Sequence, residues 1–225
     1  MLVQDRLYFV ALKSNASSRS DLKTVSGKPM HFFNIDSELV YWNFFLDFGP
    51  LNLGQLYRFS TKLNHKLKVL KNHTIVFYTS TLPAKRANGI YLICAWQLLY
   101  LGRSPEDSYR GFIRRDRELT REVVSLTTNH SSKPPKVPST TVCALPPWHD
   151  ASPCVCTYDL TVLDCLRGLS KAQTFGFFDL ETFNVEEYEH FEQVEVSTAK
   201  RKQNKILKSI PTIVLLLQLL LHIYS

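Results

Sequence analysis

The sequence has few cysteines, and their pattern excludes a disulfide framework. Five cysteines occur among 225 residues, an odd number without the spacing of a disulfide-stabilised domain. The first residues also lack the basic and apolar regions of a secretory signal. Both absences lead us to expect a reducing compartment.

A zinc-binding pattern is absent as well. Cys154 and Cys156 lie near His149, but structural zinc needs four ligands at tighter spacing. We therefore expect no metal and no cofactor. Cys94 and Cys165 instead lie in apolar helical patterns and are predicted to belong to the core.

Positive charge is not in excess where the chain is expected to fold. The net charge of +7 would suggest a nucleic-acid partner, but the surplus lies in residues 114–121 and 200–208. We interpret both as solvated charge runs and expect no nucleic-acid binding. The apolar content of 44% is enough for a proper core, so we expect one folded domain with appendages.

The chain is organised around residues 75–113. Residues 75–78 are β-branched and aromatic, which predicts a strand buried on both faces. Residues 87–101 are apolar around nearly the whole helix circumference, which predicts a central buried helix. Between them, Ser80 and Arg86 have the spacing at which cysteine-dependent phosphatases place Cys and Arg around a bound phosphate.

The reactive groups of such a loop are missing. Ser80 stands where the thiolate nucleophile would be, Thr79 stands in place of the usual His, and Pro83 removes a donor N–H. None of the five cysteines is preceded by His or followed six positions later by Arg. Two interpretations remain open: a degenerate phosphate loop, and an ordinary strand-to-helix crossover, which the spacing alone favours.

Periodicity and capping residues predict the remaining elements. Strands are expected at residues 5–12 and 31–35, with an exposed loop at 13–29 between them. Further helices are predicted from Asp36 or Ser37 to Gly49, over residues 50–70, from Ser104, from Tyr158 to Lys171, and from the capping residue Asn184.

The helix after Asn184 carries Glu186, Glu189 and Glu192, one acid every third residue along one side. Like charges so placed repel by a few tenths of a kcal/mol per pair, which suggests a basic ligand. Acids near a helix start also offset the helix dipole without any ligand. Both interpretations remain open at the level of these residues.

Composition divides the chain into four parts. The folded domain is expected to comprise residues 5–113 plus 148–195, interrupted by a disordered Ser-, Thr- and Pro-rich insertion at 114–147. A basic linker at 196–209 precedes an almost purely apolar tail at 210–225. The tail is shorter than the roughly 20 residues of a spanning helix, so it is either a marginal membrane anchor or an aggregation-prone segment.

Four stretches of the sequence resemble the N-terminal half of the Cdc-fourteen (cell-division-cycle fourteen) dual-specificity protein phosphatases. The stretches cover more than half of the chain, and they are DRLYFVAL at 5–12 and the segments 33–53, 85–113 and 156–192. The resemblance implies a dual-specificity or tyrosine phosphatase-like α/β domain, with a central sheet flanked by helices. It also implies that Ser80 and Arg86 belong to a degenerate phosphate loop without catalytic residues.

The resemblance also implies a function in recognition. In that family the N-terminal half packs on a catalytic domain, and an acidic groove between them favours phosphoserine-proline substrates with a basic residue downstream. Glu189 and Glu192 are the candidate groove acids here. We therefore expect substrate recognition and interdomain packing, with phosphoprotein or basic peptide segments and a catalytic phosphatase domain as partners. The family implies the cytoplasm or nucleus, at the spindle or centrosome.

The chain departs from this family at three places. Residues 114–147 have no recognised counterpart, the resemblance ends after about residue 195, and His-Cys-x5-Arg is absent. A truncated or alternatively spliced product, or an imperfect gene model, would explain all three, and the chain alone is expected to be inactive. The alternatives are a fragment of an active phosphatase and a tail-anchored membrane adaptor, which keeps a membrane contact through the tail possible.

Overall fold

The computed structural model describes residues 6–12, 24–25, 28–112, 124–125, 145–151 and 155–202. For residues 24–25, 124–125 and 194–202 it describes the backbone alone. The apolar tail at 210–225 and most of the predicted insertion at 114–147 lie outside these ranges, and so do Cys143 and Cys154.

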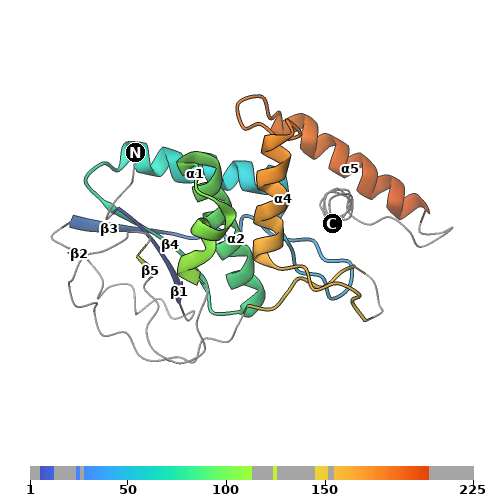
Figure 1. Cartoon of the computed structure of the whole chain (residues 1–225), viewed down its shortest axis with the longest axis horizontal. Coiled ribbons are helices and arrows are strands. Elements are labelled where there is room, and N and C mark those ends of the chain that lie inside the picture. The colour runs from blue at the N-terminus through green and yellow to red at the C-terminus, as the bar shows by residue number, and fades with distance from the viewer. Residues whose placement is uncertain are drawn as a thin grey trace.

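A five-stranded sheet forms one side of the molecule (Figure 1). Its order is β2-β3-β4-β1-β5. The three inner strands are parallel to one another: β1 (Leu7–Leu12), β3 (Lys28–Phe33) and β4 (Thr74–Ser80). The short edge strands β2 (Thr24–Val25) and β5 (Val124–Ser125) pair antiparallel to them. Parallel strands with helical connections confirm the predicted α/β class.

The core of the sheet is aromatic and is centred on Phe77 of β4. The Phe77 ring lies 5.3 Å from Phe9 of β1, 5.2 Å from Phe33 of β3 and 4.9 Å from Phe59 of the first helix, between ring centroids. Phe59 and Phe77 are fully buried. This confirms that the strand after residue 74 is the central one, because its side chains reach both neighbouring strands and a helix.

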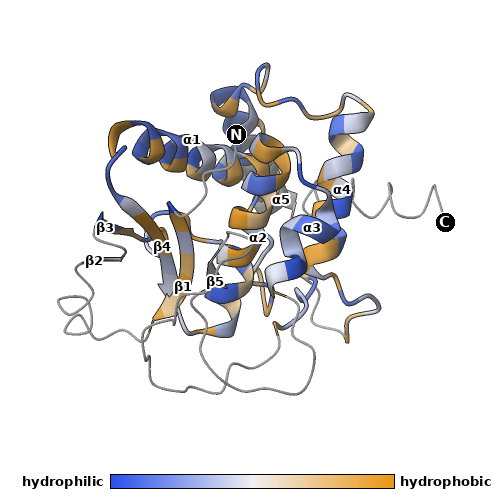
Figure 2. Ribbon diagram, turned by 60° about the vertical axis from the view of Figure 1, so that its left-hand side comes forward, coloured by the Kyte–Doolittle hydropathy of each residue, from blue (hydrophilic) through white to orange (hydrophobic). Residues whose placement is uncertain are grey.

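Five α-helices and one 3-10 turn are described, and α2 is the central one. Thirteen of its 19 residues are buried, as its uniform apolar character predicts. It lies between the sheet and α4 in both ribbon views (Figures 1 and 2). The helical segments are α1 (Leu53–Val69), α2 (Pro83–Leu101), α3 (Pro105–Tyr109) with η2 (Arg110–Phe112), α4 (Val162–Thr174) and α5 (Val185–Lys202).

Capping residues set where these helices begin. Asn52 caps α1 and Ser104 caps α3 through side-chain hydrogen bonds to backbone N–H groups. The Asn184 side chain accepts hydrogen bonds from the N–H groups of Glu186 and Glu187 at the start of α5. The predicted starts of α3 and α5 are therefore confirmed.

The helix predicted between Asp36 and Gly49 is wrong, because the structure has turns in this segment. Asp47 explains the difference. Its carboxylate accepts hydrogen bonds from the N–H groups of Phe44 and Phe45, at 2.9 and 2.7 Å, and from the Tyr41 hydroxyl at 2.8 Å. An Asp side chain that binds nearby N–H groups in this way offers the backbone an alternative to the helix.

Other boundaries also differ from the sequence prediction. The helix α2 begins at Pro83 rather than Ala87, and α5 continues to Lys202, into the expected linker. Two residues of the expected insertion, Val124–Ser125, form β5. Among the described residues, no helix combines the length and the apolar content needed to cross a bilayer.

Candidate functional site

The predicted phosphate loop is very short in the structure. Ser80 is the last residue of β4 and Pro83 is the first of α2, so only Thr81 and Leu82 connect them. Proline favours the first helical position because its fixed φ suits the helix and its missing N–H is not needed there. Of the five residues between Ser80 and Arg86, only two therefore lie outside regular structure, and the other three belong to the first turn of α2.

Arg86 lies inside α2 and not at the mouth of an open loop. It is only 7% exposed, so its guanidinium is not presented at an open surface. The Ser80 hydroxyl accepts a long hydrogen bond from the N–H of Leu82, at 3.4 Å. The structure thus keeps both predicted residues near the start of α2, but in surroundings unlike those of an accessible anion site.

The side chain of Asp36 contacts the last two residues of β4. Its carboxylate accepts hydrogen bonds from the Thr79 hydroxyl at 2.7 Å and from the Ser80 N–H at 2.8 Å. Its backbone carbonyl accepts a hydrogen bond from the Lys85 ammonium at 3.0 Å. A carboxylate of the chain itself therefore binds the N–H of Ser80, the residue at which the segment that resembles a phosphate loop begins.

Sequence reasoning placed Asp36 as a helix cap and missed this contact. The signal that would reveal it is the register of two parallel strands. Phe33 pairs with Phe77, and Asp36 and Ser80 each lie three residues further along their chains. Asn34 follows the same register, because its side-chain amide donates to the Tyr78 carbonyl at 3.2 Å.

Glu189, one of the two predicted groove acids, binds Arg58 of α1. The Arg58 Nε and Nη2 atoms donate to the two carboxylate oxygens of Glu189, each at 2.6 Å. This two-point geometry matches the planar guanidinium to the carboxylate. The hydrogen bonds from Arg58 lower the pKa of Glu189 below its ordinary value.

Glu192, the other predicted acid, lies one turn further along α5 and also faces α1. It accepts hydrogen bonds from the side-chain amide of Asn52, the residue that caps α1, and from the Tyr188 hydroxyl at 2.6 Å. Burial, followed by this hydrogen bond, raises the pKa of Tyr188. Glu186 and Glu187 are exposed, so the four acids between residues 186 and 192 divide into a pair that faces α1 and a pair open to solvent.

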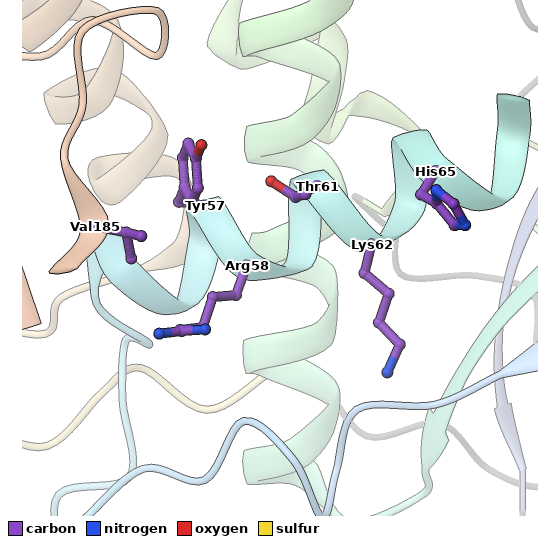
Figure 3. A pocket seen from close by; sticks show the side chains of 6 residues that line it. All are labelled: Tyr57, Arg58, Thr61, Lys62, His65 and Val185. Atoms are coloured by element: carbon purple, nitrogen blue, oxygen red, sulfur yellow. The ribbon is translucent and has the colours of Figure 1, made fainter.

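A shallow cavity lies beside the Glu189–Arg58 pair, on the solvent side of α1. Its volume is about 400 Å³. In Figure 3, Arg58 and Lys62 extend from the same side of α1. Lys62 forms an ion pair with Glu38, so both cations are bound to acids. The lining residues are Tyr57, Arg58, Thr61, Lys62, His65 and Val185.

Comparison with known proteins assigns this sequence to a family. A family model described as "Dual specificity protein phosphatase, N-terminal half" matches residues 1–121. Dual specificity protein phosphatase CDC14A of Mus musculus is 44% identical over 195 residues, which are 86% of this chain and 27% of that protein. CDC14B of the same species is 36% identical, over 86% of this chain and 33% of that protein.

A fungal relative extends the similarity. Tyrosine-protein phosphatase CDC14 of Candida albicans is 28% identical over 86% of this chain and 30% of that protein. The chain thus spans at most a third of the length of the three relatives described. The resemblance inferred from the sequence is confirmed, and this chain belongs to the family formed by the N-terminal half of dual specificity protein phosphatases.

Proposed function

We propose that this chain is a non-catalytic phosphatase-type domain, which recognises protein segments and packs against a catalytic phosphatase domain. The observation that carries the proposal is the position of Asp36. Its carboxylate accepts a hydrogen bond from the Ser80 N–H, so a phosphate dianion bound beside Ser80 would be repelled by the negative charge of Asp36. Ser80 supplies a hydroxyl where the family chemistry needs a thiolate, which also supports a role without turnover.

A basic peptide segment is the proposed ligand of Glu189 and Glu192. Glu189 already holds a guanidinium at two points, so it can bind an Arg of a peptide in the same way once Arg58 is displaced. The peptide class suggested by the family is phosphoserine-proline followed by a basic residue. Glu186 and Glu187, which are exposed, extend the negative charge next to this position.

The comparisons support a catalytic domain as the proposed partner. The relatives are named as phosphatases, and this chain covers 27–33% of those described above. A longer product that contains a catalytic half would therefore be an active protein phosphatase, acting in the cytoplasm or nucleus at the spindle or centrosome. The described residues give no support to the membrane adaptor considered from the tail.

Turnover of an aryl phosphate tests the absence of catalysis. We expect the purified full chain to release no phenolate above background, and Ser80→Ala to behave identically. A rate that stays with the chain through successive purification steps would contradict the proposal. If Ser80→Ala removed that rate, Ser80 would be the nucleophile.

Binding of a labelled peptide tests the recognition role. The probe is a phosphoserine-proline peptide with a downstream Arg, compared with the same peptide carrying Ala at that position. Arg58→Ala frees Glu189, and we expect it to tighten binding of the Arg peptide about tenfold, the scale of a charge-assisted hydrogen-bonded pair. Glu189→Gln should weaken binding by a similar factor.

Lys62→Ala is the matched control, because it removes a cation from the same cavity and leaves the Arg58–Glu189 pair in place. It should therefore change the affinity for the Arg peptide much less than Arg58→Ala. Equal affinities for the two peptides, or an unchanged affinity in both Arg58→Ala and Glu189→Gln, would exclude Glu189 as a groove acid.

A further inference from the structure

The segment that follows the predicted insertion is a loop fastened at both ends. The Trp148 N–H donates to the Leu160 carbonyl at 2.8 Å, and both side chains are buried. The Trp148 indole N–H donates to Asn88 of α2 at 3.1 Å, and its ring meets the Tyr91 ring edge-on at 5.8 Å. Trp148 thus fixes one end of the loop on the central helix, and Leu160 fixes the other end to Trp148.

Within this loop the chain brings together three different metal-binding groups. One ligand atom each of His149, Asp150 and Cys156 lies within 4.8 Å of the other two. All three residues are half-buried. Atoms this close together can share one ion without a large rearrangement of the loop.

We propose that His149, Asp150 and Cys156 form a binding site for a borderline transition-metal ion, of which Zn²⁺ is the biological example. An imidazole, a thiolate and a carboxylate are each ordinary zinc ligands, and the sulfur disfavours Mg²⁺ and Ca²⁺. Three protein ligands leave a fourth position for water or another exogenous donor. The proposal does not depend on the recognition function above.

Contacts around the ligands support this assignment. The Asp150 N–H donates to the Cys156 sulfur at 3.3 Å, and the His149 Nδ1–H donates to the Asp150 carbonyl at 2.6 Å. Outer hydrogen bonds of this kind orient metal ligands. Since a carbonyl oxygen only accepts, Nδ1 carries the proton, and the lone pair of Nε2 is the one offered to an ion.

The sequence prediction of no metal rested on counting Cys154, Cys156 and His149. The structure changes the set, because it adds the carboxylate of Asp150. The Trp148–Leu160 hydrogen bond closes the ends of the loop, and the Asp150 N–H contacts the Cys156 sulfur between the described parts of it. An ion bound to residues 149, 150 and 156 would therefore connect the two arms of this loop.

Cobalt titration of the reduced full chain tests the site. Bound Co²⁺ gives a thiolate-to-metal charge-transfer band, and we expect the wild type to reach saturation at one equivalent. Cys156→Ser should abolish the band. His149→Gln and Asp150→Asn should each weaken Zn²⁺ binding, measured by competition with a chelating dye, by at least about tenfold.

Cys165→Ala is the matched control, because Cys165 is buried in α4 outside the cluster, and the band should persist in this variant. Zn²⁺ should also raise the unfolding temperature of the wild type and of Cys165→Ala but not of Cys156→Ser. Should Cys156→Ser fail to fold by circular dichroism, His149→Gln decides the question.

Two results would overturn the assignment. The first is absence of the charge-transfer band in the wild type, or an equal band in Cys156→Ser. The second is a band that Cys154→Ser abolishes while Cys156→Ser and His149→Gln leave it intact, because the ion would then be held by other residues.

Discussion

Asp36 joins the ends of two neighbouring strands through one side chain. Asp36→Ala removes the acceptors of the Thr79 hydroxyl and the Ser80 N–H. Because donors deprived of a partner in a partly buried site carry a desolvation penalty, we expect the free energy of unfolding to fall by about 1–3 kcal/mol. Urea unfolding of the full chain measures the change. Asp36→Asn keeps one acceptor oxygen and should lose less; equal stability of the wild type and Asp36→Ala would show that neither hydrogen bond contributes.

Gly49 lies beside Asn88 of α2 and Trp148, the first residue of the loop described above. A Cβ at this position would lie 2.3 Å from Asn88 Oδ1 and 2.5 Å from Trp148 Nε1, which forces the Asn88–Trp148 hydrogen bond apart. We expect Gly49→Ala to destabilise the protein by about 1–3 kcal/mol, as overpacking does. Thermal unfolding provides the measurement.

Gly102→Ala gives the comparison for this variant. A Cβ at Gly102 would meet nothing within 4 Å, but φ is +62° there, so the Ala variant would carry backbone strain without overpacking. That strain is worth about 1–2 kcal/mol. If Gly49→Ala unfolded at the same temperature as the wild type, the Asn88 and Trp148 side chains would be able to shift without a loss of stability.

At the scale of elements, an ion pair between two helices makes the attachment of α5 to α1 depend on pH. The hydrogen bonds from Arg58 depress the pKa of Glu189 below its ordinary value of 4.5. The stabilisation is therefore present above about pH 4.5 and is lost as the pH falls through the lower folded pKa. Its size is small, about 0–1 kcal/mol, because the side chains of Arg58 and Glu189 are 51% and 32% exposed.

Carboxyl resonances of Glu189, followed by NMR during an acid titration, measure this effect. Arg58→Ala should return the Glu189 titration to its ordinary range, while Lys62→Ala should leave it low. A wild-type Glu189 that titrates at the ordinary value would show that the pair does not persist in solution.

Element prediction from sequence succeeded where a single capping residue decides, and it failed where a side chain competes with the helix for backbone N–H groups or where the partner is distant in sequence. The starts of α3 and α5 depend on Ser104 and Asn184, which act within three residues of themselves. The segment from Asp36 to Gly49 has the apolar spacing of a helix, but the Asp47 carboxylate binds the N–H groups of Phe44 and Phe45. Glu189 was found as an acid on one side of a helix, yet its partner Arg58 lies 131 residues away.

For the whole molecule, two buried thiols report on global unfolding. Cys94 and Cys165 are almost fully buried, and this burial raises the pKa of both thiols. We expect a thiol reagent to label Cys156, which is partly exposed, at least about a hundredfold faster in native protein, because the thiolate is the reactive form.

Peptide mapping after timed labelling distinguishes these three cysteines. Labelling of Cys94 and Cys165 should accelerate together as urea unfolds the chain. Rapid native labelling of either one would indicate local opening of α2 or α4 and would contradict a single packed core.

The position of α2 between the sheet and α4 determines when the chain can fold during synthesis. One side of α2 is covered by strands that are synthesised before it. The other side is covered by Cys165, Leu166 and Leu169 of α4, which are synthesised more than 60 residues after the last turn of α2. Until those residues leave the ribosome, an apolar helix face is open to chaperones or to other nascent chains. The entropy of closing the intervening loop rises by only about 0.6 kcal/mol per doubling of its length. Exon changes within residues 114–147 should therefore leave the domain foldable, whereas a stop codon ahead of α4 should yield an aggregate.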